Sequence, residues 1–96
     1  MRNIVLKRGS VAKYDDGSPF LVEAGELELR FTLPDPNGDY FLVAGKRKVA
    51  IPKDGHVSLA VTEGTLNAAV KRYIRGKLVE SYAVEPLEVM SVDGEV

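Results

Sequence analysis

Clusters of turn-forming residues interrupt this chain about every ten residues, and no other feature constrains its fold as strongly. Each cluster contains glycine or proline, and the clusters lie at 16–19, 34–39, 54–55, 63–64, 75–76 and 93–94. The runs between them are rich in β-branched, aliphatic and aromatic residues, as in small all-β sandwiches. A chain of 96 residues has room for one hydrophobic core. We therefore predict one domain over residues 1–96, an antiparallel β-sandwich of about seven or eight strands.

Alternation of apolar and polar residues is clearest over residues 26–33. Leucine and phenylalanine occupy every second position there, which predicts a strand with one buried and one solvated face. Pro34 ends this strand because proline cannot donate a hydrogen bond to a neighbouring strand. Residues 40–44 are apolar at consecutive positions, which predicts a central strand. We expect the other strands at 4–7, 20–22, 48–51, 56–61, 78–84 and 87–92, with Pro86 separating the last two.

Residues 65–76 fit two secondary structures. Their apolar residues follow a helical spacing, with Thr65 placed to cap the first turn and Gly76 placed to end the helix; they are Leu66, Ala69, Val70, Tyr73 and Ile74. A strand would instead place Arg72 among buried side chains. The predicted strands on either side favour a strand over a helix, so we predict a strand that ends in a hairpin at Gly76. The alternative is an α+β fold with one helix at 65–75.

Several classes of function are excluded by composition. The chain has no cysteine and one histidine, His56, so it lacks a thiol nucleophile and cannot build a multi-histidine zinc site within one copy. No apolar run approaches the roughly 18 residues of a membrane-spanning helix. Basic residues occur at Arg2, Lys7 and Arg8, so we expect no signal peptide. We expect neither secretion by that route nor a membrane partner.

Charge is distributed in blocks, although the net charge is only −1. Residues 1–14 carry +4, residues 15–40 carry −6, residues 41–77 carry +6 and residues 78–96 carry −5. Our first interpretation is that neighbouring strands pair opposite charges across their solvated faces. The second is that the molecule has one basic and one acidic surface, suited to contact with another copy or a partner protein.

The acidic turns do not match a metal site. Asp35, Asn37 and Asp39 begin like a calcium loop, but glycine is fourth rather than sixth and Lys46 stands at the twelfth position. Asp15 and Asp16 precede a glycine and are interpreted as turn carboxylates in the same way. We therefore predict no metal ligand and no cofactor-binding residue.

Catalytic groups are not recognisable either. His56 has no serine or cysteine nucleophile in a known arrangement, and we expect it to be exposed. No serine stands in a nucleophile-elbow motif; the serines considered are Ser10, Ser18, Ser58, Ser81 and Ser91. Neither Gly45-Lys46 nor Gly76-Lys77 belongs to a phosphate-binding loop. We predict that the protein is not an enzyme and has no catalytic residue.

Basic and aromatic residues supply two further hypotheses. The basic residues Lys46, Arg47, Lys48, Lys71, Arg72, Arg75 and Lys77 could contact phosphates, but no aromatic series accompanies them, so we expect solvated side chains and no nucleic acid partner. The tyrosines Tyr14, Tyr40, Tyr73 and Tyr82 could instead form a platform for sugars. A carbohydrate- or surface-binding module is therefore our alternative function.

The order of elements resembles a known family. An opening strand at 4–7 is followed by the amphipathic run 25–31, the string Ile-Pro-Lys-Asp-Gly-His-Val at 51–57, Glu-Gly-Thr-Leu at 63–66 and the Gly76 turn before the last strands. This pattern resembles the immunoglobulin-like N-terminal modules of phage baseplate and head- or tail-fibre proteins. The resemblance implies a structural module that attaches a fibre or receptor-binding assembly to the virion and has no catalytic residues. We therefore expect protein subunits as partners, either virion proteins or further copies, and a location in the cytoplasm during assembly and then in the virion.

Overall fold

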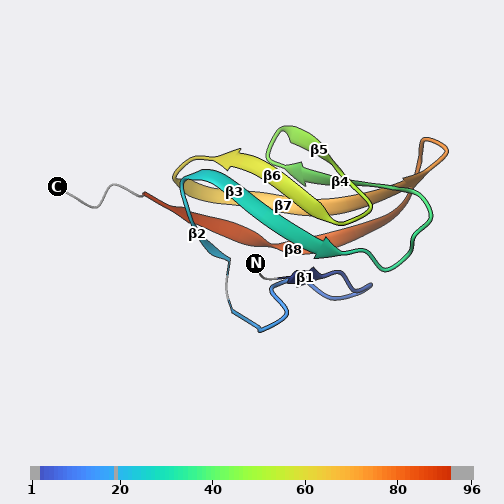
Figure 1. Ribbon diagram of the computed structural model, residues 1–96, viewed down its shortest axis with the longest axis horizontal. Coiled ribbons are helices and arrows are strands. Elements are labelled where there is room, and N and C mark those ends of the chain that lie inside the picture. The colour runs from blue at the N-terminus through green and yellow to red at the C-terminus, as the bar shows by residue number, and fades with distance from the viewer. Residues whose placement is uncertain (1–2, 19, 92–96) are drawn as a thin grey trace.

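The computed structural model describes residues 3–18 and 20–91, which form eight β-strands and no helix (Figure 1). The strands are β1 (Asn3–Val5), β2 (Leu21–Glu23), β3 (Gly25–Thr32), β4 (Asp39–Ala44), β5 (Arg47–Ile51), β6 (His56–Val61), β7 (Gly64–Ile74) and β8 (Lys77–Met90). The all-β fold predicted from the spacing of the turns is therefore confirmed.

These strands form two sheets that pack as a β-sandwich. One sheet has the order β1-β3-β6, and the other has the order β2-β8-β7-β4-β5. Figure 1 shows β3 and β6 lying across β7 and β8.

Both sheets are mixed rather than purely antiparallel. β1 runs parallel to β3, and β2 runs parallel to β8, whereas the other strand pairs are antiparallel. Residues 6–20 carry the chain from one sheet to the other between β1 and β2, so no hairpin joins either strand to its neighbour. The alternation of side chains is the same in parallel and antiparallel strands, so the sequence pattern does not encode this difference.

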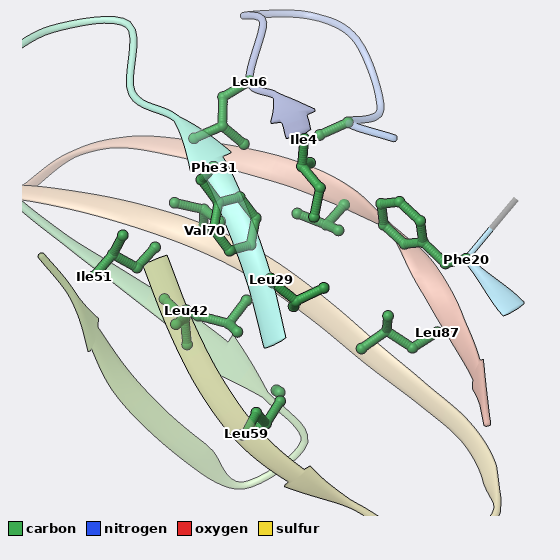
Figure 2. Packing of buried hydrophobic residues seen from close by; sticks show 14 of the residues in the cluster. Ile4, Leu6, Phe20, Leu29, Phe31, Leu42, Ile51, Leu59, Val70 and Leu87 are labelled. Carbon is green, nitrogen blue, oxygen red and sulfur yellow. The ribbon is translucent and has the colours of Figure 1, made fainter. Parts of the chain in front are cut away.

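The core lies between the two sheets, where the inward side chains of both meet (Figure 2). The largest fully buried side chains come from both sheets and from the segment before β2; they are Ile4, Phe20, Leu42, Val70 and Leu87. Leu29 and Phe31 of β3 pack into the same cluster, as their alternation predicts. The period-two pattern of the sequence therefore sets which side of each sheet is buried.

Residues 65–75 lie in β7 and its following turn, so the helical alternative is excluded. β7 bonds to β4 on one edge and to β8 on the other. A helix here would leave the facing edges of both neighbours without hydrogen-bond partners, which is costly inside a sandwich. Arg75 and Gly76 form the tight hairpin to β8, with φ angles of 52° and 79° that suit a type I′ turn.

Pro86 does not separate two strands as we predicted, because β8 continues through it. The register against β7 shifts at this point, since Ala68 pairs with Val84 and Leu66 pairs with Leu87. A bulge leaves one residue out of the regular hydrogen-bond pattern, so a proline can stand there although it has no N–H group to donate. The edge of β8 is also covered here, because the Glu85 amide donates to the carbonyl of Ala12 at 3.0 Å.

Truncation of Leu42 to alanine tests the position of the core. Leu42 is fully buried, so we expect the Leu42→Ala variant to lose about 2–5 kcal/mol of unfolding free energy through lost contacts and a residual cavity. Val11 is 54% exposed, so Val11→Ala should change stability by less than about 0.5 kcal/mol. Urea denaturation measures both variants, and equal losses would contradict the described core.

Candidate functional site

The aspartates of the two acidic turns accept hydrogen bonds from residues of the same turn. The Asp35 side chain accepts a hydrogen bond from the Asn37 amide at 2.9 Å, and Asp16 accepts from the Ser18 amide and hydroxyl at 2.9 and 2.6 Å. Within residues 3–18 and 20–91, no group of three or more histidine, aspartate or glutamate side chains is arranged to hold a metal ion. Both segments therefore act as turns, as their sequences indicate.

His56 lies on the outer face of the three-stranded sheet. Its Nε2 atom is 3.1 Å from Oε1 of Glu28, and both side chains are about half exposed. The register places Arg30 directly opposite His56 on the same face. The geometry is that of a surface pair between strands, which is worth tenths of a kcal/mol.

Arg72 organises a buried polar cluster at one end of the sandwich. Its Nε donates to the carbonyl of Asn37 at 2.9 Å, its Nη1 lies 3.2 Å from Glu80, and its Nη2 lies 3.1 Å from Asp35. These partners satisfy a guanidinium whose residue is only 8% exposed. They explain how an arginine can occupy an inner position of β7, which is the feature that made the strand prediction difficult.

The same cluster shifts the pKa of its members. The Tyr82 hydroxyl donates to Glu80 at 2.6 Å, and Arg8 also contacts this carboxylate. Hydrogen bonds from Tyr82, Arg8 and Arg72 lower the pKa of Glu80. Burial, together with the bond to Glu80, raises the pKa of Tyr82 to about 12. The ionised carboxylate and the neutral phenol therefore stabilise the folded state together.

The pH dependence of the unfolding free energy, compared between the parent protein and a Glu80→Gln variant, tests this cluster. A carboxylate whose pKa is lowered by folding stabilises the native state above its unfolded pKa, and this contribution is lost as the pH falls through the folded value. The free energy of unfolding should therefore fall below about pH 4.5 in the parent protein, and fall less steeply in Glu80→Gln. Urea midpoints at pH 6, 4 and 3 measure the difference.

Glu26→Gln is the matched control for this experiment, because Glu26 is exposed on the outer face of β3. It should leave the pH dependence of the midpoints close to that of the parent protein. An acid dependence that is identical in the parent protein and Glu80→Gln would contradict a stabilising role for the Glu80 carboxylate.

A different kind of surface covers the outer face of the five-stranded sheet. The strand register places one row of outward side chains across four strands, namely Ala50, Phe41, Lys71 and Ser81, and the next row contains Lys48, Val43, Ala69 and Ala83. All eight residues are exposed or half-buried. This face therefore presents apolar and small side chains to the solvent, with lysines among them.

An aromatic cluster with two lysines lies at one corner of this face. The rings of Phe41 and Tyr73 meet edge to face, with centroids 5.6 Å apart. The Lys48 ammonium lies 4.6 Å from both ring centroids, a cation–π arrangement, and Lys71 is paired with Phe41 in the sheet register. We call Phe41, Lys48, Lys71 and Tyr73 the basic-aromatic patch.

Two hollows flank the basic-aromatic patch. The first has a volume of about 430 Å³ and is lined by Phe41, Ala50 and the loops at 33–39 and 51–53. The second has a volume of about 370 Å³ and lies beside Val43 and Lys71. A recess beside half-buried aromatic rings is a place where side chains of a partner protein can pack.

The opposite corner of the same face is acidic and apolar. In the pairing of β2 with β8, Leu21 lies opposite Glu88 and Glu23 lies opposite Met90. Leu21 and Met90 are 54% and 46% exposed, although both are large apolar residues. We call these four residues the acidic-apolar patch.

Few residues of the charge blocks form ion pairs within the described part of the chain. Among the described residues, Arg72 is the one lysine or arginine of 41–77 that forms an ion pair, with Asp35 and Glu80. The other described ion pairs are Arg8 with Glu80 and His56 with Glu28. The cross-strand pairing that we expected is therefore wrong for most of this basic block.

The four tyrosines do not form one platform. Tyr40 and Tyr82 are buried in the core, and Tyr14 packs edge-on against Phe20 with ring centroids 4.6 Å apart. Only Tyr73, among these four, belongs to the basic-aromatic patch. The surface position of its neighbour Phe41 was not predicted, although the consecutive apolar residues at 40–44 were a usable signal, because they place apolar side chains on both faces of β4.

No family model, curated protein or solved structure matches this chain significantly. Within the part of the chain that the structure describes, no helix is long and apolar enough to cross a membrane.

Proposed function

We propose that this protein is a non-enzymatic attachment module that holds protein subunits by the outer face of its five-stranded sheet. The observation that carries the proposal is the basic-aromatic patch, in which two rings and two lysines stand on an exposed sheet face beside two hollows. Aromatic side chains dominate the binding energy of many protein interfaces, and cations at their rims improve selectivity.

The setting that we propose is a phage or prophage particle. The sequence resembles the immunoglobulin-like modules of baseplate and fibre proteins in the order of its strands and turns, and such modules join one subunit to another. A sandwich with a solvated apolar face suits this role, because the same face that is exposed in the free chain is covered in the assembly. Under this proposal the protein is made in the cytoplasm and becomes part of the virion.

A photoactivatable residue can test which face binds. We expect benzoylphenylalanine in place of Ala50, which lies opposite Phe41 on the outer face, to form covalent adducts with a protein subunit when cells expressing the gene from its own locus are irradiated. Ala60 is the matched control, because it is also exposed but lies on the outer face of the other sheet, opposite Glu26. Mass spectrometry identifies the partner.

The proposal requires that adducts form at position 50 and not at position 60. It also requires that the double substitution Lys48→Glu and Lys71→Glu remove them, since the patch would then repel an acidic partner. Equal labelling from both positions, or none from position 50, would overturn the proposed binding face.

A further inference from the structure

We infer that the subunit bound by this face is a second copy of the same chain, held face to face about a two-fold axis. In this pair, the basic-aromatic patch of each copy contacts the acidic-apolar patch of the other. The inference rests on the binding face proposed above and names its occupant. It follows from the positions of the two patches on one sheet.

The two patches lie at diagonally opposite corners of the outer face. The basic-aromatic patch spans β5, β4 and β7 and includes Tyr73, where β7 ends. The acidic-apolar patch spans β2 and β8, which lie at the other edge of the sheet. It includes Met90 at the far end of β8, next to Val89, which pairs with Gly64 at the start of β7. Both the strand order and the register therefore separate the patches.

This placement suits a closed pair of identical chains. A half-turn about an axis that lies in the interface, perpendicular to the line joining the patches, puts each patch over its complement. The contact then forms twice, and the assembly closes at two copies. Glu23 and Glu88 of one copy face Lys48 and Lys71 of the other, while Leu21 and Met90 meet the rings of Phe41 and Tyr73.

The centre of the face permits close approach. Ala69 and Ala83 are paired there, with Ser81 and Val43 beside them, so small side chains separate the patches. At about 16 Å² of sheet per strand residue, the five strands present roughly 600 Å² in projection. Protruding side chains increase this area toward the ~800 Å² per partner of a standard interface.

Complementary charge favours a second copy over an unrelated subunit. The segments 21–29, 57–70 and 78–91 contain no lysine or arginine, so the parts of β2, β7 and β8 around the acidic-apolar patch carry no basic residue. Lys48 and Lys71 form no ion pair among the described residues, although Asp39 lies opposite Tyr73 at the end of the patch. Among the described residues, the charges of both patches therefore form no ion pair, and each patch supplies the charge opposite to that of the other.

Light scattering after size exclusion tests the inference with charge-reversed variants. We expect the parent protein to be a dimer that dissociates on dilution and in high salt, because exposed charges are screened. Lys48→Glu with Lys71→Glu should raise the dimer dissociation constant by about 100-fold or more, and Glu23→Lys with Glu88→Lys should do the same. An equimolar mixture of the two variants should recover a dimer, because both contacts are again between opposite charges.

The matched control reverses the same number of charges on the other sheet. Glu26→Lys with Glu28→Lys should leave the dimer intact, and urea midpoints verify that every variant is folded. A monomer under all conditions, or failure of the mixed variants to associate, would overturn the inference. Masses that grow beyond two copies would overturn the two-fold arrangement. If the parent protein is monomeric while position 50 still cross-links to a different protein, the proposed binding face stands and the self-pairing fails.

Discussion

The rest of the structure depends on the hydrogen bonds and ion pairs of the buried Arg72 guanidinium. It lets β7 run as a strand through the middle of the five-stranded sheet, because Asn37, Asp35 and Glu80 satisfy its donors. Once Arg72 points inward, the alternation of a strand forces Lys71 and Tyr73 outward. The same residue that closes one end of the core therefore sets the composition of the exposed face.

Alternation and turn chemistry were enough to predict most of the fold. The apolar residues of β6 are buried at every second position, and those of β3 alternate in the same way, with Leu27 partly buried and Leu29 and Phe31 buried. The turn residues at 75–76 connect β7 directly to its antiparallel neighbour β8, so this hairpin could be located from the sequence. Local sequence was informative wherever neighbouring strands were also neighbours along the chain.

Features that depend on distant segments could not be predicted. β1 pairs with β3 and β2 pairs with β8, and both parallel pairs join residues far apart in sequence. The bulge at Pro86 depends on the register between β8 and β7. The same limitation applies to the candidate site. Leu21 and Met90 become one patch only because β2 pairs with β8, and the charge blocks show which residues carry charge but not which strands lie side by side.

Methyl NMR of alanine-labelled protein tests the binding face most directly. Ala50, Ala69 and Ala83 lie on the outer face of the five-stranded sheet, whereas Ala60 lies on the opposite side of the sandwich. On a hundredfold dilution, the signals of the first three methyl groups should shift while that of Ala60 stays in place. A shift confined to Ala60, or no shift in any of the four, would contradict association through this face.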